Sequence, residues 1–220
     1  MLFNDRITKA FAFLEQGGPA IWAITALSVL TGAIILWKVW RFVLAGAWAG
    51  KNTEYAVTLW TQGDRQGARA ALEGRSSLRA VVARAAMTER VEGTLDEAEQ
   101  REEVERVARR QLSEARSGLR ALELIATIAP LLGLLGTVLG MIAAFQTLQA
   151  AGSRADPAAL AGGIWEALLT TAAGMAVAIP ASVALTWFES VVDRAQGDME
   201  DAATRIMTRD QAAPSLAAAQ

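Results

Sequence analysis

The chain has 220 residues, of which 53% are hydrophobic and 20% charged, and its formal net charge is −2. This balance provides no basic field for nucleic acid, and the absence of Cys and His excludes disulfides, thiol chemistry, imidazole bases and the usual zinc sites. Charge is missing from three blocks and dense between them, which predicts an all-α membrane protein with three transmembrane helices and long cytoplasmic helical extensions.

Residues 1–18 have the pattern of an amphipathic helix that ends at Gly17-Gly18-Pro19. Its apolar face comprises Phe3, Ile7, Phe11 and Leu14, and charged residues surround this face. A helix of this kind beside a span lies most simply in the membrane interface, and an unstructured leader is the alternative.

The first predicted span covers residues 19–40 and ends in an aromatic belt with Lys38 and Arg41. A cleavable signal peptide is rejected, because the preceding leader is net neutral and the apolar run is longer than a signal core. The span has no stripe of small or polar residues, so we expect it to face lipid on the outside of an assembly.

Residues 41–121 form a predicted cytoplasmic helical loop. Thr94-Leu-Asp-Glu97 has the form of a capping box, and the apolar repeat that follows predicts one helix running through Gly118 into the membrane. Arginine and glutamate alternate along this helix, which favours a solvated or intersubunit face over a nucleic-acid site.

The second and third predicted spans cover residues 122–150 and 162–188. No charged residue stands between Glu123 and Arg154, and Glu166 is the only one between Asp156 and Glu189. Both stretches exceed the roughly 20 apolar residues that a span requires.

Each of these two spans carries a stripe of small and hydroxyl residues opposite a bulky apolar face. The stripes comprise Pro130, Gly133, Thr137, Gly140 and Ala144 in the first, and Ala167, Thr171, Gly174, Ala178 and Ser182 in the second. Small residues let helix backbones approach closely in lipid, where no hydrophobic force drives helices together. The stripes therefore predict tight helix packing and assembly.

The distribution of basic residues predicts the topology. The outer loop, residues 151–161, holds only Arg154, whereas the long loop holds many basic residues near its ends, so we expect the N-terminus outside and the C-terminus inside. Asp156-Pro157 is typical of the start of a helix. Residues 189–220 are expected to form a cytoplasmic helical tail whose end is too plain in sequence to fold.

Two motifs carry a family resemblance. The run GLLGTVLGM, followed by a helix containing IWEALLTTAAGMAVAIPA, resembles the TolQ/ExbB/MotA family of motor stator subunits, most closely its ExbB branch. The resemblance covers the last two spans at motif level and the whole chain in layout. It implies a bacterial inner-membrane homopentamer around the helix of an ExbD-like single-span partner, with proton flow through that interior coupled to motion.

The same resemblance assigns roles to three residues. Glu166 matches a glutamate that lines the interior of the pentamer, and Thr137 and Thr171 match pore threonines, with Thr170 as a further hydroxyl of open role. The alternatives are a hydrated Glu166 at the membrane interface and threonines that only bond a carbonyl one turn back. The residues expected to serve helix packing are Pro130, Gly133, Gly136, Gly140, Gly174 and Pro180, where a simple kink is the alternative for the two prolines.

The resemblance implies a proton channel and stator that energises TonB-dependent outer-membrane transport through a TonB-like protein. A TolQ-like subunit for envelope maintenance and a non-conducting structural scaffold are the alternatives. No nucleophile, metal set or phosphate loop is visible, so we expect neither an enzyme nor a cofactor. The acid that is protonated in each cycle is absent from the middle of every span, and in the family the partner supplies it.

Overall fold

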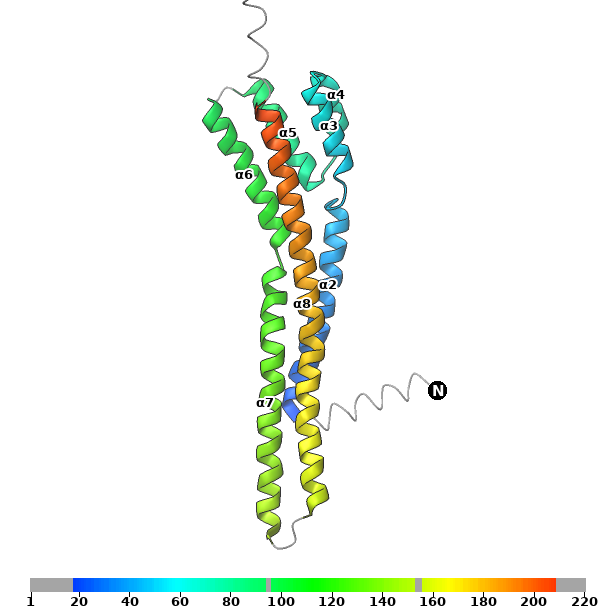
Figure 1. The fold of residues 1–220 in the computed structure, drawn as a ribbon, viewed down its shortest axis with the longest axis vertical. Coiled ribbons are helices and arrows are strands. Elements are labelled where there is room, and N and C mark those ends of the chain that lie inside the picture. Colours follow the sequence, from blue (N-terminus) through cyan, green and yellow to red (C-terminus); the bar gives the residue numbers. More distant parts are fainter. Residues whose placement is uncertain (1–17, 94–95, 153–155, 209–220) are drawn as a thin grey trace, which may run out of the picture. The chain divides into compact units, whose positions relative to one another are not determined.

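The computed structural model describes residues 18–93, 96–152 and 156–208, and all regular elements in these ranges are α-helices (Figure 1). In chain order they are α2 (Gly18–Leu44), α3 (Lys51–Thr61), α4 (Arg65–Leu72), α5 (Leu78–Glu92), α6 (Glu97–Arg116), α7 (Leu119–Ala151) and α8 (Pro157–Thr208). The expected amphipathic helix, apart from Gly18, and the end of the tail lie outside the described residues.

Three helical stretches of the described chain are long and apolar enough to cross a membrane, which confirms the predicted class of an all-helical chain with three candidate spans. They are α2, the stretch that contains α7, and α8. The prediction of one helix running unbroken into the second span is wrong. Gly118 takes a left-handed φ of 81°, which separates α6 from α7 and is readily adopted only by glycine.

The start of α6 also differs from the prediction. The capping box is formed by Asp96 and Glu99, because Asp is as good an N-cap as Thr and stands directly before the helical run. Thr94, the expected cap, lies outside the described residues. The Glu99 amide donates to Asp96 Oδ1 at 2.8 Å, and the Asp96 amide donates to Glu99 Oε2 at 3.1 Å.

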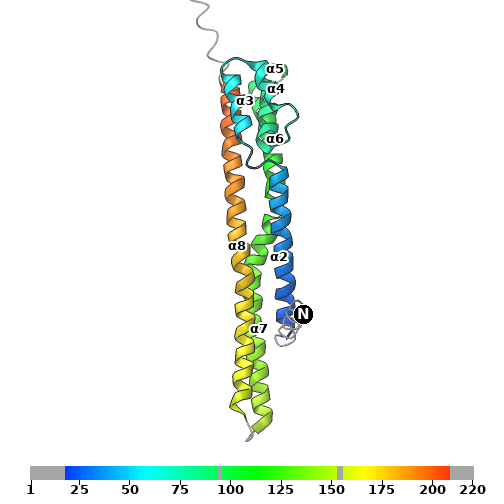
Figure 2. The ribbon, with the colours of Figure 1, turned by 90° about the vertical axis from the view of Figure 1, so that its right-hand side faces the viewer.

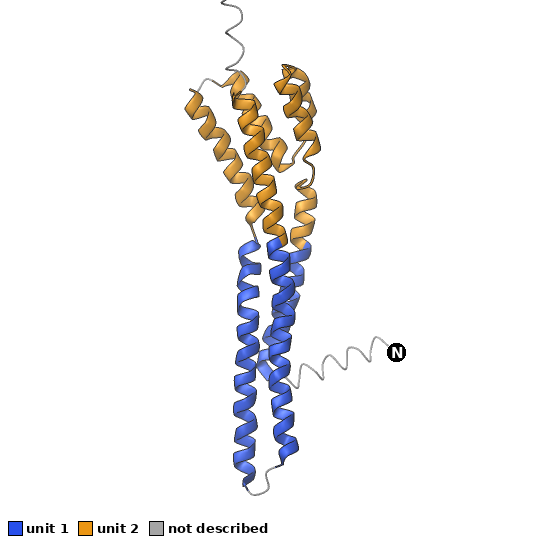
Figure 3. Ribbon diagram, viewed as in Figure 1, with its two compact units in different colours: residues 1–36, 118–186 blue, residues 37–117, 187–220 orange. Residues whose placement is uncertain are grey.

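The chain divides into two compact units, unit 1 from Met1–Leu36 and Gly118–Thr186, and unit 2 from Trp37–Ser117 and Trp187–Gln220 (Figure 3). In unit 1, parts of α2, α7 and α8 lie side by side in both views (Figures 1 and 2). Their shared core comprises Ile24, Ile125, Ala129, Val177, Ala178 and Ala181. The bulky residues opposite the stripes are about half exposed and include Leu131, Leu135, Leu139, Met175, Ile179 and Val183. The outer surface of unit 1 is thus strongly apolar.

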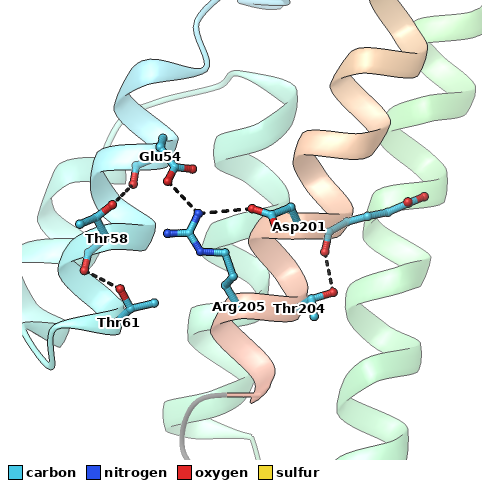
Figure 4. A network of polar contacts seen from close by, with 7 residues as sticks. Glu54, Thr58, Thr61, Asp201, Thr204 and Arg205 are labelled. Atoms are coloured by element: carbon cyan, nitrogen blue, oxygen red, sulfur yellow. Dashed lines mark hydrogen bonds and ion pairs between the residues drawn. The ribbon is translucent and has the colours of Figure 1, made fainter.

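Unit 2 packs α3 to α6 with the second half of α8 around a separate apolar core. The core includes Ala56, Leu72, Val82, Met87, Met199 and Ile206. Figure 4 shows Arg205 of α8 between Glu54 of α3 and Asp201, with Nη1 2.7 Å and 3.3 Å from their carboxylate oxygens. The hydrogen bond that Arg205 donates to Glu54 raises the pKa of Arg205 above its usual range. This pair links two elements that are far apart in the sequence.

A buried lysine in unit 2 holds the end of α6. Lys38 is fully buried, and its Nζ donates to the carbonyl oxygens of Ala115 and Ser117, both at 2.5 Å. Its ammonium also lies 4.7 Å from the ring centroid of Phe42, a cation–π distance. These two carbonyls lie in the last turn and at the C-cap of α6. Carbonyls at a helix C-terminus have no helical N–H to accept from, so Lys38 supplies the missing donor.

Candidate functional site

Two threonine hydroxyls meet between α7 and α8 in unit 1. Thr137 Oγ1 and Thr171 Oγ1 are 2.7 Å apart, and either can be the donor. Each is also 3.1 Å from the carbonyl oxygen of Gly133, one turn before Thr137. Both side chains are half-buried. Two residues that are far apart in the sequence therefore share one acceptor.

The proton count of this cluster permits two arrangements. Each hydroxyl has one proton to donate, while a carbonyl oxygen accepts two hydrogen bonds. If Thr137 donates to Gly133, Thr171 donates to Thr137; in the opposite arrangement both roles are reversed. The hydroxyl pair can thus pass a hydrogen bond in either direction without moving a heavy atom.

Close backbone approach brings the two hydroxyls together. A Cβ at Gly133 would lie 2.9 Å from the Thr170 carbonyl oxygen, and one at Gly174 would lie 2.5 Å from the Ala129 carbonyl oxygen. A Cβ at Gly140 would lie 3.0 Å from that of Ala167. The small stripes of α7 and α8 therefore pack against each other within one chain.

Thr170 has different surroundings from Thr171. It is only 2% exposed, and its hydroxyl lies 2.7 Å from the Ala167 carbonyl oxygen and 3.1 Å from that of Gly133. A Cβ at Gly136 would lie 2.6 Å from Thr170 Oγ1 and 3.0 Å from the Cβ of Ala20 in α2. Thr170 is therefore enclosed where three helices meet.

Glu166 lies one turn before Thr170 on the same face of α8 and is half-buried. It lines a cavity of about 170 Å³ in unit 1, together with Thr170, Gly136, Gly140 and the first residues of α2. No hydrogen bond joins Glu166 to the threonine pair in the described part of the chain. Glu166 thus lines a cavity together with Thr170, whereas Thr137 and Thr171 bond each other and do not line that cavity.

The two predicted prolines lie inside their helices. Pro130 of α7 is half-buried and Pro180 of α8 is exposed. Each lacks the amide that an interior helical residue donates, so one carbonyl of the preceding turn loses its usual partner. They remain candidates for local bends.

Sequence reasoning missed two buried basic residues, Lys38 and Arg79. The sequence predicts Lys38 only as a flanking charge of the first span, and the signal for its burial is its place among aromatic residues at the end of that span. The side chain of Arg79 is 8% exposed and forms a 2.6 Å ion pair with Asp198. That pairing joins residues far apart in the sequence, so no local pattern predicts it.

The fold and the long apolar stretches of α7 and α8 define an all-helical, multi-pass membrane protein. A profile of the MotA/TolQ/ExbB proton channel family matches residues 74–201, which is more than half of the chain. The match includes α7 and the threonine pair. The chain belongs to this family, which is a transport class and not an enzyme class.

Curated relatives support the ExbB branch. The chain is 45% identical over 84 residues to the biopolymer transport protein exbB1 of Vibrio cholerae serotype O1, covering 38% of this chain and 37% of that protein. It is 43% identical over 82 residues to the biopolymer transport protein ExbB of Xanthomonas campestris pv. campestris, covering 37% and 32%. For ExbB of Neisseria gonorrhoeae the identity is 48% over 67 residues, covering 30% of each. The chain thus matches about a third of the length of these relatives.

Proposed function

We propose that this chain is the ExbB-like inner-membrane subunit of a motor that uses the proton motive force to energise TonB-dependent outer-membrane transport. Five copies surround the single span of an ExbD-like partner, and a TonB-like protein transmits the motion. The observation that carries the proposal is the 2.7 Å contact between the hydroxyls of Thr137 and Thr171, in apolar stretches of α7 and α8 whose one charged residue is Glu166.

The proposal gives the threonine pair a chemical role. Hydroxyls both donate and accept, so the pair can hold a water or pass a proton beside an acid that enters from a neighbouring helix. The chain has no charged residue between Glu123 and Arg154, and Glu166 alone between Asp156 and Glu189. The acid that is protonated in each cycle must therefore come from the partner, with Glu166 as a second carboxyl along the route.

The proposed topology follows the basic residues. Residues 41–121 and 189–220 lie in the cytoplasm, and the short connection between α7 and α8 lies in the periplasm, with the N-terminus on the same side. The exposed apolar surface of unit 1 is available for both lipid and neighbouring copies. A closed ring uses this surface on each subunit.

A structural scaffold is the rival function. The bonds from Thr137 and Thr170 to carbonyls of their own helices are those expected of packing threonines in a membrane. The short contact between hydroxyls of different helices favours the channel, because packing alone does not require it.

The proposal is tested by purifying the tagged full chain from its native membrane in mild detergent and measuring the mass of the complex. We expect five copies together with a small single-span protein, and loss of energised outer-membrane uptake when the gene is deleted. A lone monomer or dimer would contradict the ring. If the complex is purified intact but the deletion strain keeps normal uptake and has a damaged envelope, the TolQ-like role would be identified instead.

A further inference from the structure

Unit 2 contains a basic pocket that the channel proposal does not use. The cavity measures about 280 Å³ and lies between the segment after α2, the start of α3, α5 and α8. We define the basic pocket by its charged residues and one aromatic residue: Lys51, Arg79, Arg194, Asp198 and Trp48.

Arg79 forms a fixed floor for the pocket. Its Nε donates to Asp198 Oδ2 at 2.6 Å and its Nη1 donates to the Ala47 carbonyl oxygen at 2.6 Å. A guanidinium has five N–H groups, so these two bonds leave donors to spare. A Cβ at Gly50 would lie 3.7 Å from Arg79 Nε, so the glycine keeps this side of the guanidinium uncovered.

The charges of the pocket are unbalanced. Asp198 is its single carboxylate and is bound by Arg79. Arg194 bonds only the carbonyl and hydroxyl oxygens of Ser190, at 3.0 Å and 2.9 Å, within the described chain. Lys51 is exposed and has no ion pair among the described residues. Asp193, beside Arg194, is paired with Arg116 at 3.6 Å. Two cations therefore lack a counter-charge.

The pocket lies at the depth of lipid headgroups. Arg194 follows Phe188, the end of the predicted third span, by six residues, which is about 9 Å of helix. The headgroup layer of a bilayer is roughly 5–8 Å thick on each side. The Arg194 guanidinium bonds Ser190, one turn nearer the span, so its charge lies within this layer. Trp48 and Trp187 stack with centroids 6.1 Å apart and are each about half exposed, as is typical of aromatic residues at a membrane interface.

We propose that the basic pocket binds the headgroup phosphate of an anionic phospholipid. Lys51 and Arg194 contact the phosphate oxygens above Arg79, and the Trp48–Trp187 pair packs against the glycerol and upper acyl chain. Basic pockets beside transmembrane helices are suited to such headgroups. A soluble phosphate would use the same cations but would gain nothing from the two exposed indoles.

The test is native mass spectrometry of the full chain in mild detergent, titrated with phosphatidylglycerol or phosphatidylcholine of identical acyl chains. We expect tighter binding of the anionic lipid, by about tenfold. The double variant Lys51→Gln/Arg194→Gln should lose roughly 5- to 25-fold in affinity for that lipid, because each surface cation contributes about fivefold. The matched control is Arg109→Gln/Arg110→Gln, which removes the same charge from the exposed face of α6 and should bind as the wild type does.

Four outcomes would overturn the proposal. Equal binding of both lipids, or equal losses in both double variants, would leave only unspecific lipid contact. Complete competition by glycerol phosphate at the lipid's own concentration would assign the pocket to a soluble phosphate. The same spectra report the oligomeric mass, so rings that dissociate in the Lys51→Gln/Arg194→Gln variant without a change in lipid binding would assign it to a subunit contact.

Discussion

A threonine hydroxyl has one proton to give, and three hydroxyls lie 3.1 Å from the Gly133 carbonyl oxygen. This carbonyl also accepts the helical N–H of Thr137, so it can accept only one of the three hydroxyls. Thr170 has a second acceptor at Ala167, 2.7 Å away. Thr170 can therefore donate to Ala167, and the Gly133 carbonyl oxygen remains available as an acceptor for the Thr137–Thr171 pair. At the scale of single residues, the three threonines thus separate into a structural hydroxyl and a pair that can exchange donors.

Replacing Thr170 by Val tests that separation. Volume is kept and the hydroxyl is lost in a site that is 2% exposed, so we expect a stability loss of about 1 kcal/mol with conduction largely retained. Thermal unfolding in detergent and proton flux in liposomes measure the two effects. A silent Thr170→Val in unfolding combined with abolished flux would move Thr170 into the proton route.

Glu166 is expected to act in conduction rather than in assembly, because it lines a cavity and bonds none of the threonines in the described chain. Glu166→Ala should assemble normally and lose most energised uptake, while Glu166→Asp should keep part of it. Uptake by the alanine variant at the wild-type rate would return Glu166 to a hydrated interface residue.

At the scale of elements, the contact between α7 and α8 depends on Gly133 and Gly174, neither of which has space for a side chain. Gly174→Ala would place a Cβ 2.5 Å from the Ala129 carbonyl oxygen, so the helices must separate, at a cost of roughly 1–3 kcal/mol. Gly162 of the same helix has nothing within 4 Å of its Cβ position. Gly162→Ala should therefore be neutral or gain up to about 1 kcal/mol. Equal unfolding temperatures of the two variants would contradict the close contact.

The end of α6 depends on Lys38. Lys38→Met keeps most of the volume but leaves the Ala115 and Ser117 carbonyls without their donor, which should cost about 1–3 kcal/mol. Arg109→Met, on the exposed face of α6, is the control and should change stability by less than about 0.5 kcal/mol. Comparable losses in both variants would show that Lys38 contributes nothing specific as a cap.

The sequence could predict periodic features of the fold but not contacts that depend on how helices cross. Charge-free length was enough for the three candidate spans, and the small stripes marked the faces that carry Thr137 and Thr171. The break at Gly118 was missed because a glycine inside an apolar repeat is compatible with either a helix or a left-handed turn. The enclosure of Thr170 depends on the close approach of Ala20 in α2 to Gly136 in α7. No local sequence pattern encodes this approach.

At the scale of the whole molecule, assembly and conduction make separate demands on the sequence. The small stripes are used within the chain, so in the proposed ring the contacts between copies rely on the exposed apolar faces, including Leu131, Leu135 and Ile179. A conservative change there, such as Leu135→Met, should leave the ring intact by native mass spectrometry.

The central claim is that the Thr137–Thr171 pair serves proton transfer, and proton flux into liposomes containing the chain with its co-purified partner tests it most directly. Thr171→Val keeps shape and removes the hydroxyl, whereas Thr171→Ser keeps the hydroxyl and loses a methyl. We expect both variants to form normal complexes, with flux reduced at least about tenfold in Val, equivalent to about 1.4 kcal/mol of barrier, and largely retained in Ser. A Val variant that conducts as well as Ser or better would show that the threonine pair is structural.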